Sequence, residues 1–64
     1  MLMKSRFVET SHGQVQLVED EGTDFLLIEG ADGMNYGCVH KNCQDMFLNN
    51  REYREDIISY ALSF

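Results

Sequence analysis

The chain has 64 residues, with 11 acidic side chains against 5 basic ones and a formal net charge of −6. This length allows a single small domain, residues 1–64, whose core leaves little room for a substrate cleft. The negative charge repels phosphates and anionic lipids, which disfavours direct binding to nucleic acids or membranes.

Four runs between turn segments predict four β-strands, near residues 5–10, 14–19, 24–29 and 34–39. The first two alternate between apolar and polar residues, whereas the third contains the continuous apolar run of residues 25–28. Short segments containing Gly and Asp separate these runs, at residues 11–13, 19–22 and 30–33. Strands joined in chain order by short turns form an antiparallel meander.

The last third of the chain changes to helical spacing. Asn49 or Asn50 can cap a helix, and Glu52 lies three residues after Asn49, as a capping box requires. The helix that follows has an apolar stripe, made of Tyr53, Ile57, Tyr60, Ala61 and Phe64. A shorter helix is predicted near residues 41–48, where Cys43, Met46 and Phe47 also follow helical spacing.

These elements predict the α+β fold class. We expect a four-stranded antiparallel β-meander followed by one short and one longer C-terminal α-helix, both packed on one face of the sheet. Side chains alternate between the two faces of a strand, so the sequence also predicts which residues meet the helices.

We expect the larger and more aromatic face to meet the helices, with the residues Phe7, Val15, Leu17, Phe25, Leu27, Met34, Tyr36 and Cys38. The second face takes Val8, Val18, Leu26, Ile28 and Val39, mixed with the polar residues Arg6, Gln14 and Gln16. The C-terminal helix cannot cover both faces. We therefore expect the second face to be an apolar interface, for a partner protein or for a homodimer; the alternative is a two-sided core that the short helix closes.

The acidic residues form the other candidate binding feature. No Lys or Arg occurs between Phe7 and His40, and that stretch contains Glu9, Glu19, Asp20, Glu21, Asp24, Glu29 and Asp32. In an extended chain, the carboxylates of Glu19 and Glu21 would lie ~6–7 Å apart, close to the spacing of neighbouring phosphates. In size, charge and order of elements the chain is similar to phage-encoded inhibitors that present carboxylates as a decoy nucleic-acid backbone, although it shares no motif with them. A solvated turn that keeps the sheet soluble accounts for the same residues without binding.

Cys38, His40 and Cys43 are the remaining candidates for chemistry. Their C-x-H-x-x-C spacing lacks the paired C-x-x-C knuckle of many zinc sites, and His12 is expected at the other end of the sheet. A set of Cys43, His40 and Asp45 would still need an oxyanion site and a substrate cleft. We therefore predict no metal, no cofactor and no enzymatic activity, and keep a Cys/His metal or thiol site as the weakest alternative.

The location predicted from the sequence is the cytoplasm. The first ten residues have no apolar run suited to a secretory leader, and no segment approaches the ~20 apolar residues of a membrane span. Two cysteines without such a leader are typical of reduced thiols.

The sequence thus predicts a small acidic protein-binding module, a regulator or inhibitor that acts through a sheet face and an acidic rim. Its expected partner is a protein with a basic or apolar surface. The alternative is a DNA-mimic inhibitor of a nucleic-acid-binding protein. The predicted partner-binding residues are Glu19, Asp20, Glu21, Asp24, Leu26, Ile28, Val8 and Val18.

Overall fold

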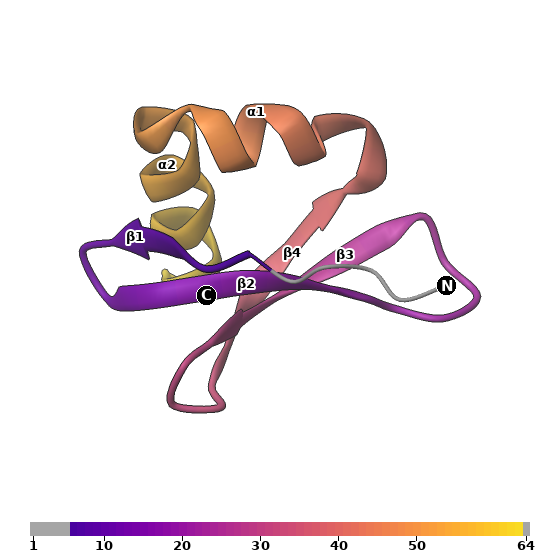
Figure 1. Cartoon of the computed structure of the whole chain (residues 1–64), viewed down its shortest axis with the longest axis horizontal. Helices are drawn as coiled ribbons and strands as arrows, with labels where there is room; N and C mark the ends of the chain where they lie inside the picture. The colour runs from indigo at the N-terminus through magenta and orange to yellow at the C-terminus, as the bar shows by residue number, and fades with distance from the viewer. Residues whose placement is uncertain (1–5, 64) are drawn as a thin grey trace.

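The computed structural model describes residues 6–63, which form a four-stranded antiparallel sheet followed by helices (Figure 1). The strands are β1 (Val8–Thr10), β2 (Gly13–Glu19), β3 (Phe25–Gly30) and β4 (Asn35–His40). A 3-10 turn, η1 (Lys41–Cys43), leads into α1 (Gln44–Asn49) and α2 (Arg51–Leu62). The predicted meander followed by a short and a longer helix is confirmed.

Each strand pairs with the next one in sequence, so the order in the sheet is β1-β2-β3-β4. The β1–β2 turn is tight, because only two residues separate the paired Thr10 and Gly13. The β2–β3 loop is longer and is closed by a hydrogen bond from Asp20 N to Phe25 O of 3.3 Å. An even number of residues separates the last paired residues of each connection, Thr10 and Gly13 in the first and Glu19 and Leu26 in the second. Because side chains alternate along a strand, this number determines which residues of neighbouring strands lie on the same face of the sheet.

The core lies between the sheet and the two helices, which occupy the same side of the sheet (Figure 1). From the helices, Phe47 of α1 and Ile58 of α2 are fully buried. The core residues that the sheet provides are Val8, Val15, Leu17, Leu26, Ile28, Tyr36 and Val39.

The predicted division of the sheet into faces is confirmed for Val15, Leu17 and Tyr36, which are buried beneath the helices, and is wrong for the other core residues. Val8, Leu26, Ile28 and Val39, which were expected on an uncovered face, are buried beneath the protein's own helices, and Met34, which was expected to meet the helices, is 55% exposed. The reason is the even turn length: Val8 pairs with Val15, and Leu17 with Ile28. An even-numbered residue of one strand therefore points to the same side as an odd-numbered residue of the next.

The start of α2 is set by Asn50, whose side-chain oxygen accepts a hydrogen bond of 3.0 Å from the backbone N–H of Tyr53. Asn49 is instead the last residue of α1, so the capping box expected between Asn49 and Glu52 does not form. Satisfying an otherwise unpaired N–H of the first turn stabilises the helix start.

The buried side of α2 is rotated from the predicted stripe. Ile58 and Arg54 face the sheet, whereas Tyr60 is 67% exposed. Tyr53, Ile57 and Ala61 are half-buried at the margin of the contact, and Phe64 lies outside the described residues. An apolar pattern cannot predict this orientation, because the residue that occupies one of the two buried positions is a cation.

Gly37, which lies in a bulge of β4, lets α2 approach the sheet closely. Tyr36 and Gly37 stand together opposite Ile28, where the pairing with β3 shifts by one residue. Gly37 has a φ of 113°, and a Cβ atom at this position would lie 2.7 Å from the Cβ of Ala61. Both the backbone conformation and the helix contact therefore require glycine at position 37.

Candidate protein-binding face

The side of the sheet opposite the helices, called the outer face below, is defined by the strand register. Its residues are Phe7, Glu9, Gln14, Gln16, Val18, Phe25, Leu27, Glu29, Asn35, Cys38 and His40. Two cross-strand hydrogen bonds join side chains on this face. The Nε2 of Gln14 donates to Glu9 Oε2 at 2.8 Å, and the Nε2 of Gln16 donates to Glu29 Oε1 at 3.3 Å.

An apolar stripe crosses the outer face. Val18, Leu27 and Cys38 lie side by side on β2, β3 and β4, because Val18 pairs with Leu27 and Leu27 pairs with Cys38. Phe25 extends the stripe along β3 and is 45% exposed. We call these four residues, together with Phe7, the outer stripe.

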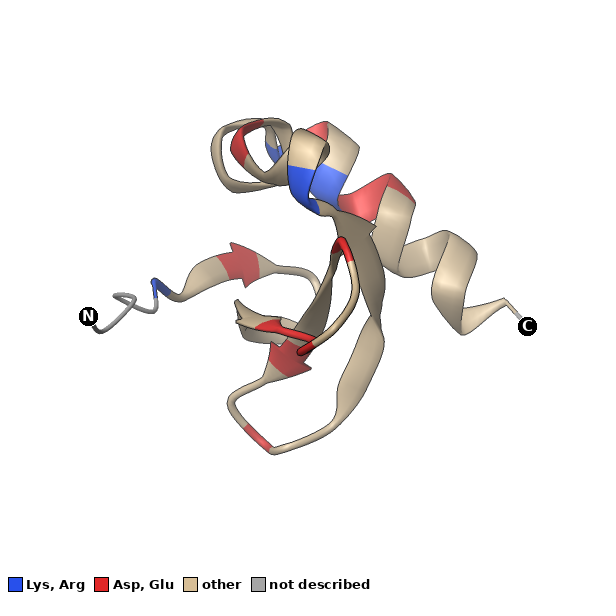
Figure 2. Cartoon of the chain, turned by 90° about the vertical axis from the view of Figure 1, so that its right-hand side faces the viewer, with Lys and Arg blue, Asp and Glu red and all other residues tan. Residues whose placement is uncertain are grey.

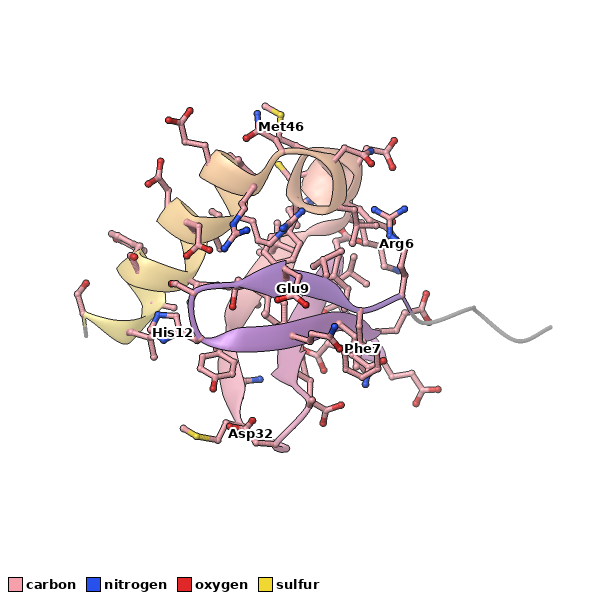
Figure 3. All side chains as sticks on the ribbon, turned by 60° about the vertical axis from the view of Figure 1, so that its left-hand side comes forward. Arg6, Phe7, Glu9, His12, Asp32 and Met46 are labelled. Carbon is pink, nitrogen blue, oxygen red and sulfur yellow. The ribbon has the colours of Figure 1, made fainter. Side chains whose placement is uncertain are left out.

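Phe7 completes the outer stripe at the β1 side of the sheet. It precedes the buried Val8, which pairs with Val15, and so lies level with Gln16 on the outer face. Its side chain is 44% exposed and lies in front of the β1–β2 hairpin, on the side away from the core (Figure 3). Two exposed phenylalanines therefore stand at opposite ends of the stripe.

Carboxylates border the outer stripe on two sides. Glu29 lies two residues from Leu27 on β3, and Glu9 lies two residues from Phe7. At the other end, the β2–β3 loop carries Asp20, Glu21 and Asp24 directly before Phe25, with Glu21 and Asp24 exposed. Asp20 and Glu21 therefore adjoin the Phe25 end of the outer stripe, whereas Asp24 stands opposite Lys41, one residue out of phase with Phe25.

Glu19, like Asp24, is an exception among the predicted acids. It pairs with the buried Leu26, so its side chain leaves the sheet on the helical side. Its Oε2 atom lies 3.8 Å from the Nζ of Lys41 in η1. The structure therefore places Glu19 in an exposed ion pair away from the outer face.

Every Lys and Arg among residues 6–63 contacts the helical side of the molecule. Arg6 donates to the Leu48 carbonyl at 2.9 Å, Lys41 pairs with Glu19, and Arg51 Nε lies 3.4 Å from Glu55 Oε2. The fourth cation, Arg54, is buried. In Figure 2 the blue segments lie on the helical layer and beside the N-terminal trace, while the sheet loops carry only red. The described part of the outer face thus has carboxylates and no Lys or Arg.

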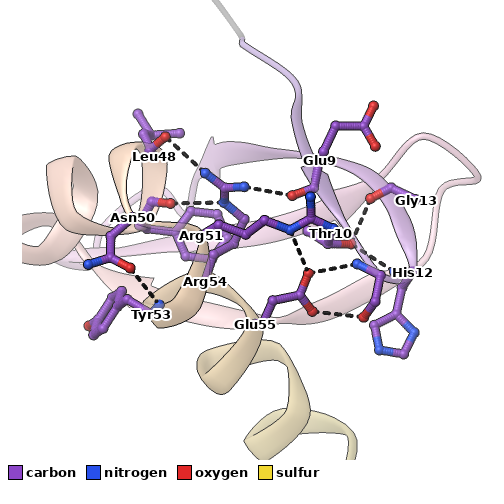
Figure 4. A network of polar contacts seen from close by, with 12 residues as sticks. Glu9, Thr10, His12, Gly13, Leu48, Asn50, Arg51, Tyr53, Arg54 and Glu55 are labelled. Atoms are coloured by element: carbon purple, nitrogen blue, oxygen red, sulfur yellow. Dashed lines mark hydrogen bonds and ion pairs between the residues drawn. The ribbon is translucent and has the colours of Figure 1, made fainter.

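The buried Arg54 joins α1, α2 and β1 through three carbonyl groups (Figure 4). Its Nε donates to Phe47 O at 3.0 Å, its Nη2 to Leu48 O at 3.0 Å and its Nη1 to Glu9 O at 2.6 Å. Burial lowers the pKa of Arg54, although an arginine stays charged at neutral pH. The guanidinium satisfies carbonyls near the end of α1 that the helix leaves unpaired, which is a structural role.

Glu55 fixes the β1–β2 turn to α2. Its carboxylate accepts hydrogen bonds from Ser11 Oγ at 2.7 Å and from Ser11 N at 2.8 Å (Figure 4). The hydrogen bond from the Ser11 hydroxyl is the main cause that lowers the pKa of Glu55, with Arg51 acting in the same direction. Glu55 is therefore engaged in holding the fold together.

The residues considered for metal or thiol chemistry are dispersed. Cys38 is exposed on the outer face, whereas Cys43 packs against the core next to Tyr53, and a hydrogen bond with Cys43 raises the pKa of Tyr53. His12 stacks on Tyr36 with ring centroids 5.8 Å apart, and His40 stands edge-on to Phe25 at 5.3 Å. Within residues 6–63, no group of three or more His, Cys, Asp or Glu side chains is suitably placed to hold a metal ion, and no pocket is found.

The structure divides the predicted partner-binding residues into three sets. Val18, Asp20 and Glu21 lie on or beside the outer face, Val8, Leu26 and Ile28 lie in the core, and Glu19 and Asp24 lie at the positions next to Lys41. The sequence prediction missed Phe7, Phe25, Leu27 and Cys38 as surface residues. The signal that could have identified them is the even number of residues in the first two turns.

A comparison of the chain with protein-family models, curated proteins and solved structures finds no match. In the described part of the chain, neither helix has the length and apolar character needed to cross a membrane. The function is therefore inferred from the geometry and charge of the outer face.

Proposed function

We propose that this protein is a small protein-binding module, a regulator or inhibitor, whose binding surface is the outer stripe with the acids beside it. One observation carries the proposal: the Lys and Arg residues among residues 6–63 all lie on the helical side, while the acidic residues beside the exposed apolar residues of the outer face have no Lys or Arg among them. A partner that complements this surface has apolar side chains within a basic region.

The outer stripe can supply the affinity of such an interface. Removing apolar surface from water contributes roughly 25 cal/mol per Å², and aromatic anchors dominate many interfaces. Phe7 and Phe25 remain about half exposed at the two ends of the stripe, so each has surface left to bury. Asp20 and Glu21 would mainly raise the association rate and select for a basic partner.

A basic protein fits this face better than nucleic acid, an anionic membrane or a second copy of the chain. Phosphates would meet Glu29 and the acids of the β2–β3 loop, and so would the same carboxylates of a second copy. The homodimer that the sequence predicted would form through Leu26 and Ile28, but both residues are in the core and cannot contact a second copy. A cytoplasmic location is part of the proposal.

The proposal is tested by capture from an extract of the source cells with three immobilised proteins. These are the wild type, Leu27→Glu in the outer stripe, and Met46→Glu on the exposed surface of α1. The two variants carry the same added charge, and circular dichroism verifies that both fold. We expect a partner that the wild type and Met46→Glu retain and that Leu27→Glu loses.

Partners captured equally by all three proteins would contradict the proposal. Elution with increasing salt separates the proposal from DNA mimicry. A decoy that binds through carboxylates loses its partner steeply as salt rises, whereas an interface built on the outer stripe keeps most of its affinity. Complete release at moderate salt, with no effect of Leu27→Glu, would favour the DNA mimic.

A further inference from the structure

We infer that the outer face binds a basic, amphipathic α-helix of the partner, lying diagonally across the sheet along the outer stripe. This inference rests on the proposed function and specifies the element that the partner contributes. It depends on the length of the outer stripe, on the charges along its two sides and on the poorer fit of a β-strand to the same face.

The outer stripe has the dimensions of a short helix. From Phe7 to Phe25 it passes from β1 to β3, two strand spacings or ~10 Å, and advances four residues along the strands, or ~13 Å. The diagonal is therefore ~16 Å, and a helix of about 11 residues has this length. Three turns of a helix would contact Phe7, the paired Val18 and Leu27, and Phe25 in succession.

The acids match the flanks of such a helix. Glu29 lies on one side of the diagonal and Asp20 lies on the other, while Glu9 lies beyond the Phe7 end and Glu21 lies in the loop beyond the Phe25 end. A helix with an apolar stripe presents its flanking positions to both sides of that stripe at once. Lysine or arginine at those positions of the partner helix would therefore meet a carboxylate on either side. A basic partner surface with no apolar side chains of its own would leave Phe7 and Phe25 exposed.

A strand is a less suitable occupant of this face. An extended peptide gains most of its affinity from backbone hydrogen bonds along a sheet edge, whereas helices bind grooves and faces through apolar anchors. The outer stripe lies across the face, with Val18 and Leu27 on the two central strands. The protein's own α1 and α2 cover the inner face of the same sheet, and a helix on the outer face would complete a layered α/β/α arrangement.

The test uses three labelled synthetic peptides of about 14 residues with equal leucine and lysine content. The helical probe has leucine at i, i+3, i+4 and i+7 spacing, the strand probe alternates leucine and lysine, and the third is scrambled. Fluorescence anisotropy measures affinity, and backbone amide chemical shifts locate the binding surface. We expect the helical probe to bind at least ~10-fold more tightly than the others, a difference of about 1.4 kcal/mol.

Variants separate binding at the outer face from general attraction between opposite charges. Leu27→Glu, with Phe25→Ser as a second variant in case the first fails to fold, should weaken the helical probe at least ~10-fold. Asp20→Asn with Glu29→Gln should weaken it several-fold. Glu52→Gln with Asp56→Gln removes the same net charge from the exposed side of α2 and should have a smaller effect, under about 2-fold.

Three results would overturn the inference. The first is equal affinity for the helical and scrambled probes, and the second is amide shifts confined to a sheet edge or to α1 and α2. The third is sedimentation of the chain alone as a dimer that Leu27→Glu dissociates, because a second copy would then occupy the face. If capture from extract depends on Leu27 while the helical probe fails, the proposed function stands and only the helical partner is wrong.

Discussion

Leu26 and Leu27 are neighbours on the same strand, yet they lie on the two contrasting faces of the sheet. Leu26 is 2% exposed in the core under the helices, whereas Leu27 is half-buried among the outer-stripe residues. The residue type and strand are the same, so the difference comes from which face the helices cover. The face under the helices, here called the inner face, therefore stabilises this domain, while the outer face retains apolar surface that can bind a partner.

The charged groups follow the same division. On the inner side, Arg54 and Glu55 are held by hydrogen bonds to β1 and to the β1–β2 turn, and they connect α2 to the sheet. On the outer side, the carboxylates of Glu9 and Glu29 accept hydrogen bonds from the side chains of Gln14 and Gln16. Changes to the inner groups should therefore affect folding, and changes to the outer groups should affect binding.

The largest expected difference is between Leu26→Ala and Leu27→Ala. Leu26→Ala should lower the free energy of unfolding by about 2–5 kcal/mol, because it removes buried contacts and leaves a cavity. Leu27→Ala should lower it by less than about 1 kcal/mol. Urea unfolding followed by circular dichroism measures both values. Similar losses for the two variants would show that the two faces do not differ as described.

Arg54→Met should lower the free energy of unfolding by about 3 kcal/mol, because three carbonyl groups lose a charged donor while the apolar stem is kept. The matched control is Arg51→Met, which removes an exposed ion pair with Glu55 and should change stability by less than about 1 kcal/mol. Thermal and urea unfolding of both variants provide the comparison. A loss in Arg51→Met as large as in Arg54→Met would contradict the structural role of the buried guanidinium.

Gly37→Ala should cost about 2–3 kcal/mol, because the added methyl group meets Ala61 of α2 and the backbone has positive φ. Gly33→Ala is the control, since Gly33 also has positive φ but a Cβ atom there would meet nothing within 4 Å. The control should cost only about 1 kcal/mol. Equal losses, measured by urea unfolding, would mean that α2 does not approach β4 closely at Gly37.

Glu55→Gln should have the smallest of these effects, about 1 kcal/mol at neutral pH, because the amide can accept from Ser11 without a charge. The pKa of Glu55 is lowered in the folded protein. Its contribution to stability is therefore complete above the unfolded value near ~4.3 and is lost as pH falls through the lower folded value.

The measurement for Glu55 is the free energy of unfolding between about pH 7 and pH 3. Wild type should lose stability more steeply below about pH 4.5 than Glu55→Gln does. Glu52→Gln, at an exposed position one turn earlier on α2, serves as the control and should keep the wild-type pH dependence. Parallel curves for wild type and Glu55→Gln would exclude the Ser11–Glu55 contact as a source of acid sensitivity.

The order and type of the elements could be predicted from local patterns. Alternation in β2, the short apolar run of β3, glycines in the turns and helical spacing after Asn50 each depend on neighbouring residues, and all agree with the structure. Within the candidate site, Asp20 and Glu21 were predictable for the same reason, because acids in a loop between two strands remain at the surface.

The pairing between strands and the orientation of α2 depended on contacts between residues distant in the sequence. A change of one residue in a turn moves every side chain of the next strand to the other face, so Leu26 and Leu27 exchange roles without any change in their own sequence. The rotation of α2 depended on Arg54, whose buried guanidinium is satisfied by the carbonyls of Phe47, Leu48 and Glu9. Hydrophobic periodicity carries no information about such acceptors, because they belong to the backbone of other elements and come together only when the chain folds.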